Sequence, residues 1–266
     1  MAKSKDETPI RSRGLSYSQL SKFYQCEMAW YIAYVKRVRL PGGEAMFIGS
    51  MFHAMLEESY ARGARISRQK INGLFKKMLQ EDFAESTFDA TGALDRLLTL
   101  YDRYCDYYPD DFEIDVISIE DQRYDGVISG VADLLYRSKK GLLVVREHKT
   151  KGKLELQPAD FQRDFYSRLW PEVDMVEYNM VNTYNYKKPP DSLSKVFGRT
   201  PQFSTQDNQD RLQYAIDYAV ERMSLMRSQD AEPQCAFFYN NCRFCDGKSE
   251  CPAQLALPMD LREEVN

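Results

Sequence analysis

One acidic residue and a short charged run are the sharpest candidates for chemistry in this sequence. Asp133 lies in an apolar stretch, and Glu147, His148 and Lys149 follow one predicted hairpin later. Because side chains alternate along a strand, Glu147 and Lys149 share one face and His148 points to the other. If the register aligns the two strands, two carboxylates and one ammonium converge beside the apolar run 142–145, where charges without partners would be costly.

The pattern alone leaves two interpretations of this group open. Lys149 could pair with Asp133 as a surface salt bridge between neighbouring strands. Alternatively, the two carboxylates could bind a divalent cation, because close carboxylates repel each other unless a cation joins them. Such oxygen ligands suit Mg²⁺ or Mn²⁺. A bound ion would activate a water and neutralise charge on a phosphate, and Lys149 could orient that water, which predicts phosphodiester hydrolysis.

Basic residues gather around these positions. Between positions 137 and 153 only Glu147 opposes the basic residues, which are Arg137, Lys139, Lys140, Arg146, Lys149, Lys151 and Lys153. A second cluster comprises Lys187, Lys188, Lys195 and Arg199. Solvated surface charge explains most clusters of this kind. Beside a hydrolytic site, however, these residues would be expected to bind a phosphodiester backbone.

Three of the six cysteines have the spacing C-x2-C-x5-C, namely Cys242, Cys245 and Cys251. The close pair can turn both thiolates toward one ion, so a metal site explains the spacing better than isolated thiols do. Zinc sites usually contain two such pairs, whereas a 4Fe–4S cluster takes four thiolates with less regular spacing. The spacing does not fix the fourth ligand, which could be Cys235 or Cys26. Cys105 is expected to be an ordinary buried helix cysteine.

The elements that must position these residues follow from hydrophobic periodicity and turn residues. Helices are predicted over residues 16–37, 47–61, 67–85, 91–107, 158–170 and 207–228. Strands are predicted over 114–121, 127–137, 141–149 and 175–186, the first three as an antiparallel meander. Residues 187–206 are predicted to form a polar loop. We therefore expect an α/β or α+β fold, with a central mixed sheet of about four to five strands flanked by helices.

Composition indicates a globular protein with a sizeable core. The chain has 266 residues, of which 43% are hydrophobic and 29% charged, and this balance excludes extensive disorder. No run approaches the ~18 apolar residues of a membrane span, and the charged start lacks the apolar segment of a secretory signal. A cytoplasmic protein is therefore expected. The formal net charge of −4 neither requires nor excludes a nucleic-acid partner.

The expected organisation is a single domain over residues 15–252, in which both chain ends form one accessory region. Residues 15–110 are expected to be mainly helical. Residues 111–186 would contain the central sheet and a helix, and residues 187–252 the last helix and the cysteine cluster. Residues 1–14 and 253–266 are expected to be tails.

Several motifs, in order along the chain, resemble the PD-(D/E)xK nuclease superfamily in its RecB-like exonuclease branch. That branch carries an iron–sulfur cluster and includes CRISPR-associated RecB-like exonucleases and the AddB nuclease domain. The motifs are LSYSQLSKFYQCEMAWYIAYV, IGSMFHAMLE, GVADLLYRSKKGLLVVREHKT, FQRDFYSRLW and the terminal cysteine spacing. The resemblance covers about residues 15–252 and implies a restriction-endonuclease-like core.

The resemblance also implies a role for each matched residue. His53, Asp133, Glu147 and the backbone carbonyl of His148 would bind Mg²⁺ or Mn²⁺, and Lys149 would assist the attacking water. Gln162 and Tyr166, four residues apart on one helix face, would touch the substrate or shape the site. Cys242, Cys245 and Cys251 would hold a 4Fe–4S cluster, and the resemblance favours Cys26 over Cys235 as its fourth ligand. The family often has Asp at the position of Glu147.

The function implied is a metal-dependent DNA exonuclease that acts on DNA ends in recombination, repair or DNA processing. No Walker A motif is present, so unwinding by ATP hydrolysis is not expected of this chain, and a recombination or helicase protein is a candidate partner. Two alternatives stay open: a non-catalytic DNA-end-binding or recombination-partner protein on the same fold, and a zinc-stabilised binding module. Strand polarity, strandedness, endonuclease activity and oligomeric state are not fixed by any motif.

Overall fold

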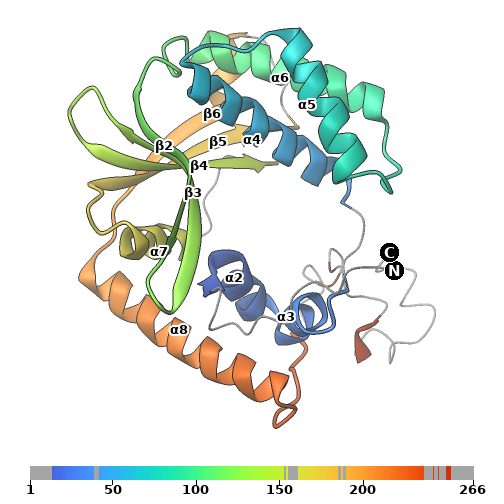
Figure 1. Cartoon of the computed structure of the whole chain (residues 1–266), viewed down its shortest axis with the longest axis vertical. Coiled ribbons are helices and arrows are strands. Elements are labelled where there is room, and N and C mark those ends of the chain that lie inside the picture. The colour runs from blue at the N-terminus through green and yellow to red at the C-terminus, as the bar shows by residue number, and fades with distance from the viewer. Residues whose placement is uncertain are drawn as a thin grey trace. The chain divides into compact units, whose positions relative to one another are not determined.

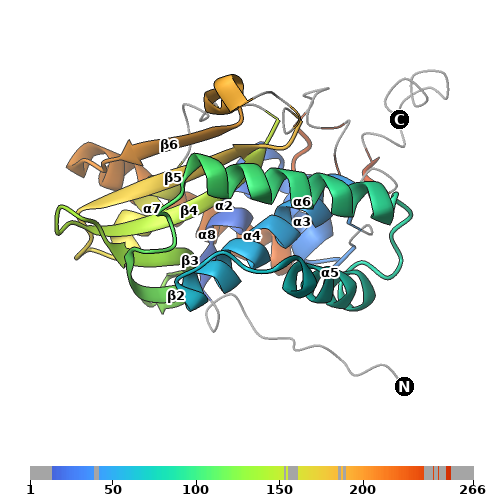
Figure 2. The same cartoon turned by 90° about the horizontal axis from the view of Figure 1, so that it is seen from above.

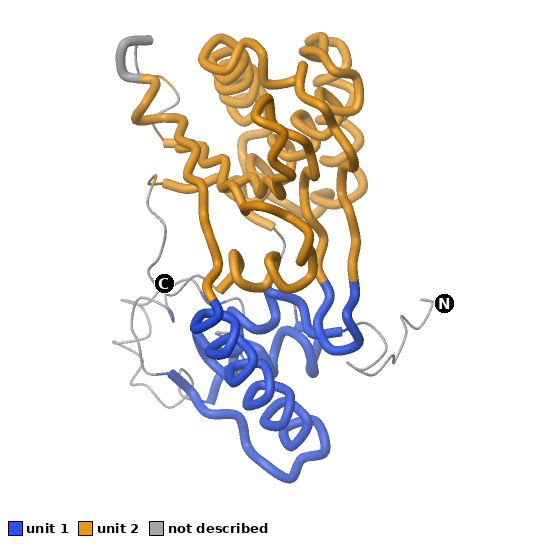
Figure 3. Tube along the Cα trace, turned by 90° about the vertical axis from the view of Figure 1, so that its left-hand side faces the viewer, with its two compact units in different colours: residues 1–40, 124–129, 206–266 blue, residues 41–123, 130–205 orange. Residues whose placement is uncertain are grey.

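The computed structural model describes residues 14–38, 42–152, 154, 161–184, 187, 190–236, 242, 245 and 250–252. The expected tails lie outside these residues, apart from Gly14. The chain divides into two compact units (Figure 3). Unit 1 comprises residues 1–40, 124–129 and 206–266, and unit 2 comprises residues 41–123 and 130–205. The expected single domain over 15–252 stays a prediction. Within the described residues, no helix is long and apolar enough to cross a membrane.

Unit 2 is built on a mixed sheet (Figures 1 and 2). Its strands are β2 (Asp115–Tyr124), β3 (Ile128–Arg137), β4 (Leu143–Lys151), β5 (Met175–Asn182) and β6 (Phe197–Gln202). β2 pairs with β3, and β3 pairs antiparallel with β4. β4 and β5 pair in parallel, and β5 and β6 pair antiparallel. The expected mixed α/β architecture is therefore confirmed.

Two layers of helices cover this sheet. α4 (Glu44–Arg62), α5 (Arg68–Glu81) and α6 (Ala90–Tyr107) share a hydrophobic core with Leu134 of β3 and Val144 of β4. α7 (Gln162–Leu169) contacts Glu147 and Lys149, whose side chains alternate with those of that core and therefore occupy the other face. Residues 158–160 of the helix predicted over 158–170 lie outside the described residues.

The polar loop predicted over residues 187–206 was wrong in part. This region contains a 3-10 turn, Pro190–Lys195, followed by strand β6. β6 has the sequence FGRTPQ, in which glycine and proline weaken the strand signal. Its backbone pairs with β5, from Val181 opposite Phe197 to Val176 opposite Gln202. Proline is tolerated at such an edge, where one side of the strand has no ladder to break.

Unit 1 contains segments from both ends of the chain. Strand β1 (Leu15–Ser16) pairs in parallel with the first residues of β3. α2 (Tyr17–Gln25), α3 (Glu27–Tyr34) and α8 (Gln206–Arg227) complete its regular structure. The helix predicted over 16–37 is thus two helices, because Cys26 between them is extended, with φ −169° and ψ 117°. A bidentate contact from Arg222 of α8 to Glu27 of α3, at 3.0 Å for each bond, ties the two chain ends together.

Candidate active site

The candidate active site of unit 2 lies where β3 and β4 separate. Their register extends from Arg137 opposite Leu143 to Leu134 opposite Arg146, and both strands continue beyond that last pair. Asp133 and Glu147 occupy the next positions, so the structure brings the two predicted carboxylates to the same step of the fork. The backbone N–H of His148 donates to Asp133 Oδ2 at 2.7 Å. A side-chain oxygen therefore takes the place of a backbone acceptor at this step.

Glu147 is buried and held by α7 and by Lys149. The hydroxyl of Tyr166 donates to Glu147 Oε2 at 2.6 Å, and Gln162 Nε2 donates to Glu147 Oε1 at 2.8 Å. Lys149 Nζ lies 3.1 Å from Glu147 Oε1 and also donates to Gln162 Oε1. Burial, followed by the charge of Asp133, raises the pKa of Glu147. Burial disfavours the ionised carboxylate, and the negative charge of Asp133 repels it. Gln162, Tyr166 and Lys149 thus all lie at the predicted site.

Asp133 is paired with His53 of α4. His53 Nδ1 lies 3.5 Å from Asp133 Oδ2. Although burial opposes it, the contacts with His53 and with the His148 backbone lower the pKa of Asp133. Burial also disfavours the charged form of His53 and by itself would lower the pKa of His53, but the hydrogen bond and charge of Asp133 raise it. The predicted histidine and carboxylate therefore stabilise each other's charged forms.

The side chain of His148 lies on the face of β4 opposite Glu147, as strand alternation predicts, and its ring contacts that of His53 edge-on, with centroids 5.6 Å apart. It is only 4% exposed, and burial lowers its pKa to about 3, so the ring is neutral near pH 7. Its Nδ1 is 2.8 Å from Nδ2 of Asn179, and its ring stacks on Tyr60. The backbone N–H of His148, and not its ring, donates to the carboxylate of Asp133.

Oxygen donors at the fork fit a divalent cation. Among the described residues, no group of three or more His, Cys, Asp or Glu side chains has the arrangement of a ready-made metal site. Asp133 and Glu147 nevertheless lie close enough for the charge of one to raise the pKa of the other. A divalent cation would remove that repulsion, and carboxylate and carbonyl oxygens are the ligands that Mg²⁺ and Mn²⁺ prefer.

Two further carboxylates act on the fork and were not predicted. Burial, followed by the charges of Asp133 and Glu57, raises the pKa of Glu120 to about 7. Glu120 has φ 52°, a left-handed backbone that is uncommon outside glycine and is typical of a strand bulge. Glu57 follows His53 by four residues on α4, so helix periodicity could have indicated it. No local pattern indicates Glu120.

Two of the basic residues expected at a phosphodiester surface are held in ion pairs instead, and Arg146 is also buried. Arg146 is 2% exposed and pairs with Asp111 at 2.8 Å. Arg199 pairs with the same carboxylate at 2.6 Å, and its guanidinium lies 3.8 Å from the centroid of the Tyr108 ring. These two arginines therefore share the buried carboxylate of Asp111 in ion pairs. Lys153 and Lys188 of the same clusters lie outside the described residues.

Cysteines from both ends of the chain gather in unit 1. Cys26, Cys235 and Cys251 pack in one cluster with Met28 and Ile32, and the sulfurs of Cys235 and Cys251 are 3.8 Å apart.

Contacts with Ala236 extend this group. Its N–H lies 3.4 Å from Cys26 Sγ, and its carbonyl lies 3.7 Å from Cys242 Sγ. The backbone N–H of Cys245 donates to the carbonyl of Cys242 at 3.2 Å, which connects Cys245 to this group. Cys105 belongs to α6 and to the buried core of unit 2, as expected.

Comparisons with known proteins agree with this geometry. The sequence model of the PD-(D/E)XK nuclease superfamily matches residues 14–252. A crystal structure from Eubacterium rectale, named "Putative exonuclease", aligns over 99% of this chain and 98% of its own, with a TM-score of 0.52 and 8% identity. At that identity the likeness concerns the fold alone.

Other comparisons add less. The crystal structure of SSO0001 aligns over 90% of this chain and 96% of its own, with 15% identity and a TM-score of 0.36, which is too low to support an argument. No curated protein matches the chain. The superfamily match, however, spans the fork, α4 and α7, and with them every residue of the candidate site. The chain belongs to the PD-(D/E)XK nuclease superfamily.

Proposed function

We propose that this nuclease is a metal-dependent DNA exonuclease that hydrolyses phosphodiester bonds at DNA ends. The observation that carries the proposal is the fork, where two carboxylates adjoin the ammonium group of Lys149. A role in recombination, repair or DNA processing, and membership of the RecB-like branch, follow from the order of the sequence motifs.

Asp133, Glu147 and the carbonyl of His148 would hold Mg²⁺ or Mn²⁺, with His53 as a further ligand. Such an ion supplies an activated water and offsets negative charge on the phosphate. Without the ion, His53 is paired with Asp133 at 3.5 Å; as a ligand its ring would give up that proton and be neutral. Gln162 and Tyr166 orient the carboxylate of Glu147 from the α7 side.

Lys149 would orient the attacking water and stabilise charge on the phosphate. Glu147 and Gln162 hold its ammonium at the fork, so the charge is positioned before any substrate arrives. Preorganisation of this kind contributes to catalysis because little rearrangement is needed in the transition state. A non-catalytic DNA-end-binding protein would not require a buried pair of repelling carboxylates, which favours the catalytic proposal.

The test compares end-labelled linear DNA with closed circular DNA in Mg²⁺ or Mn²⁺, using anaerobically purified protein. Glu147→Gln removes a proposed ligand, and Glu85→Gln is a matched control at an exposed position. Loss of the linear substrate alone, abolished only by Glu147→Gln, is the expected result. Cutting of the circle would indicate an endonuclease. Binding of DNA ends without cutting would favour the non-catalytic alternative.

The second part of the proposal is that Cys26, Cys242, Cys245 and Cys251 hold a 4Fe–4S cluster in unit 1. Its support is the gathering of cysteines from both chain ends around Ala236. Cys235 lies within 3.8 Å of Cys251 and is the alternative fourth ligand. Such a cluster would be structural, because its ligands come from both ends of the chain.

Metal analysis of the same anaerobic protein tests the cluster. About four irons and four sulfides per chain, with absorbance near about 400 nm, are expected for a 4Fe–4S centre with four thiolates. Zinc in place of iron would overturn the cluster and favour a zinc-stabilised module. Cys26→Ser and Cys235→Ser separate the two candidate ligands, since only the true ligand should lower the iron content.

A further inference from the structure

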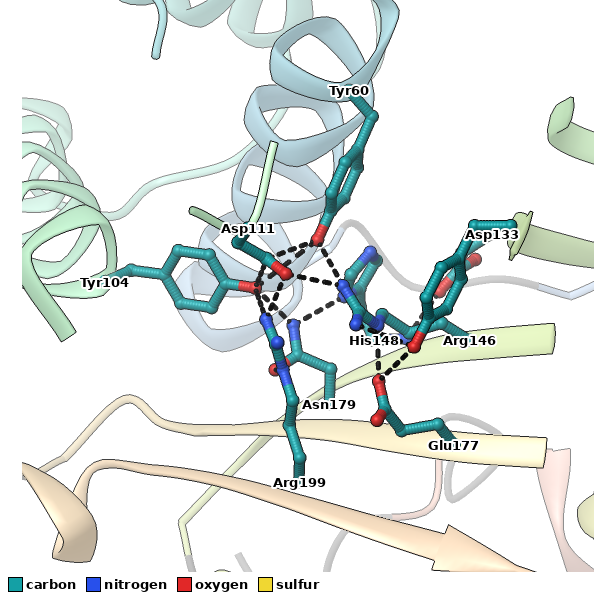
Figure 4. A network of polar contacts seen from close by, with 10 residues as sticks. Tyr60, Tyr104, Asp111, Asp133, Arg146, His148, Glu177, Asn179 and Arg199 are labelled. Carbon is teal, nitrogen blue, oxygen red and sulfur yellow. Dashed lines mark hydrogen bonds and ion pairs between the residues drawn. The ribbon is translucent and has the colours of Figure 1, made fainter. Parts of the chain in front are cut away.

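His148 links the fork to a buried polar network on the other face of β4 (Figure 4). Its backbone N–H donates to Asp133 Oδ2, whereas its side chain lies on the face opposite Glu147. The N–H group and the carbonyl of this residue flank one Cα atom. Whatever fixes the side chain therefore also fixes the backbone groups that serve the fork.

Asn179 holds the ring of His148 from the neighbouring strand. The register of β4 and β5 places Asn179 directly opposite His148. Asn179 Nδ2 lies 2.8 Å from His148 Nδ1. On its flat face the ring stacks on Tyr60, with centroids 5.7 Å apart and an interplanar angle of 10°. A hydrogen bond and a stacking contact thus fix the ring together.

The amide of Asn179 is itself oriented by its neighbours. Nδ2 also donates to the hydroxyl of Tyr104 at 2.8 Å, and Oδ1 accepts from Arg199 Nε at 3.4 Å. A flipped amide would turn its NH₂ group toward the donor Arg199 and lose that bond. The NH₂ group therefore faces His148, whose Nδ1 accepts and whose ring proton lies on Nε2.

Asp111 anchors the whole arrangement. Its carboxylate accepts hydrogen bonds of 2.6 to 2.8 Å from Tyr60, Tyr104 and Arg146, and it forms an ion pair with Arg199 at 2.6 Å. Arg146 donates in addition to Glu177 Oε1 at 2.5 Å. The buried Arg146 and the partly exposed Arg199 thus face two carboxylates, and such a network is rigid because loss of a partner would leave a buried charge uncompensated.

We propose that Asn179 is a positioning residue for the metal site: through the ring of His148 it fixes the backbone that holds Asp133 and supplies the metal-binding carbonyl. This inference rests on the proposed function. Asn179 touches neither Glu147 nor Lys149 in the network described, so its effect on the metal passes through His148. Partners that orient a metal ligand commonly change metal affinity about 10- to 100-fold when removed.

Direct Mn²⁺ titration of the purified, cluster-intact protein tests the inference. Asn179→Ala is expected to weaken Mn²⁺ binding about 10- to 100-fold. Cleavage should recover when Mn²⁺ is raised in proportion. Ser59→Ala is the matched control, because it removes a buried hydrogen bond to Tyr101 at 2.7 Å elsewhere in unit 2. The control should lower stability without changing Mn²⁺ affinity. If Asn179→Ala does not fold by circular dichroism, Asn179→Leu replaces it, since a leucine side chain is of similar size and can neither donate to nor accept from His148 Nδ1.

The outcomes separate this inference from the proposed function. Weaker Mn²⁺ binding in the Asn179 variant, with unchanged binding in Ser59→Ala, supports the inference. Equal affinity in the wild type and the Asn179 variant overturns it, while the proposed function stands if Glu147→Gln abolishes binding. Wild-type protein that binds no Mn²⁺ overturns both.

Discussion

The two faces of β4 carry opposite electrostatic arrangements. On the network face, Arg146 and Arg199 are matched by Asp111 and Glu177, so the buried charges sum to zero. On the fork face, the charges of Asp133, Glu57 and Glu147 act on Glu120, and the charge of Asp133 acts on Glu147. The cationic partners there are Lys149 and His53. One strand therefore separates a balanced interior from an acidic surplus.

The balanced charges of the network maintain the fold, whereas the excess carboxylates of the fork are available to bind a cation. The network lowers the pKa of Asp111, mainly through Arg146 and Arg199 acting against burial. The fork instead raises the pKa of Glu147 and of Glu120. A raised carboxyl pKa means that the folded protein opposes the charge, and a cation would reverse that opposition. The predictions below test the contrast between the faces.

The largest effect is expected on the fork face, in activity. Glu147→Gln removes one of two ligand carboxylates and should slow DNA cleavage about 10⁴-fold, which corresponds to roughly 5.5 kcal/mol of transition-state stabilisation. The measurement is single-turnover cleavage at saturating Mn²⁺, with circular dichroism to verify folding. Activity within tenfold of wild type would show that the fork does not carry the reaction.

On the network face the expected effect is on stability. Asp111→Asn would leave Arg146 and Arg199 with one carboxylate fewer, and breaking a buried pair in this way costs about 3–5 kcal/mol. Urea unfolding in metal-free buffer measures the loss. Asp110→Asn is the control, since Asp110 is an exposed neighbour paired with Lys139 at 3.6 Å. Equal, small losses in both variants would contradict the contrast between the faces.

Local patterns predicted most of the fold, and failed where the structure depends on distant contacts. The alternation in β3 and β4 indicated which side chains face the fork, because a period of two needs no tertiary information. The helix break at Cys26 and strand β6 were missed. β6 is a strand because β5 pairs with it, from Val176 opposite Gln202 to Val181 opposite Phe197. Its own composition does not indicate that pairing.

The same reason explains what was missed at the site. Arg146 and Arg199 were expected to bind phosphodiesters, because a count of charges does not reveal burial. Asn179 lies 31 residues from His148 and meets it only through the parallel pairing of β4 and β5. Motifs identify residues that carry chemistry, but residues that orient them depend on register and packing.

Metal binding at the fork should stabilise the folded protein. At Mn²⁺ concentrations near 100 times the dissociation constant, the free energy of unfolding should rise by about 2.7 kcal/mol, because the ion binds only the folded state. Asp133→Asn should abolish that rise, whereas Glu85→Gln should keep it. Thermal unfolding with and without Mn²⁺ measures the effect. An undiminished rise in Asp133→Asn would place the ion elsewhere.

The smallest effect concerns pH and the neutral ring of His148. Burial lowers its pKa to about 3 in the folded protein, against about 6.5 when unfolded. Below about pH 6.5 the unfolded chain therefore binds a proton that the folded protein does not, so stability falls as the pH decreases. The slope from this residue should be about 1 kcal/mol per pH unit between about pH 6 and 5.

A comparison of wild type with His148→Gln isolates this contribution. His53 has a raised pKa and changes the stability in the opposite direction, but this effect is present in both proteins and cancels in the comparison. Urea unfolding at a series of pH values in metal-free buffer should give a shallower slope for His148→Gln. Equal slopes would mean that His148 becomes protonated in the folded state, and that burial on the network face does not keep its ring neutral.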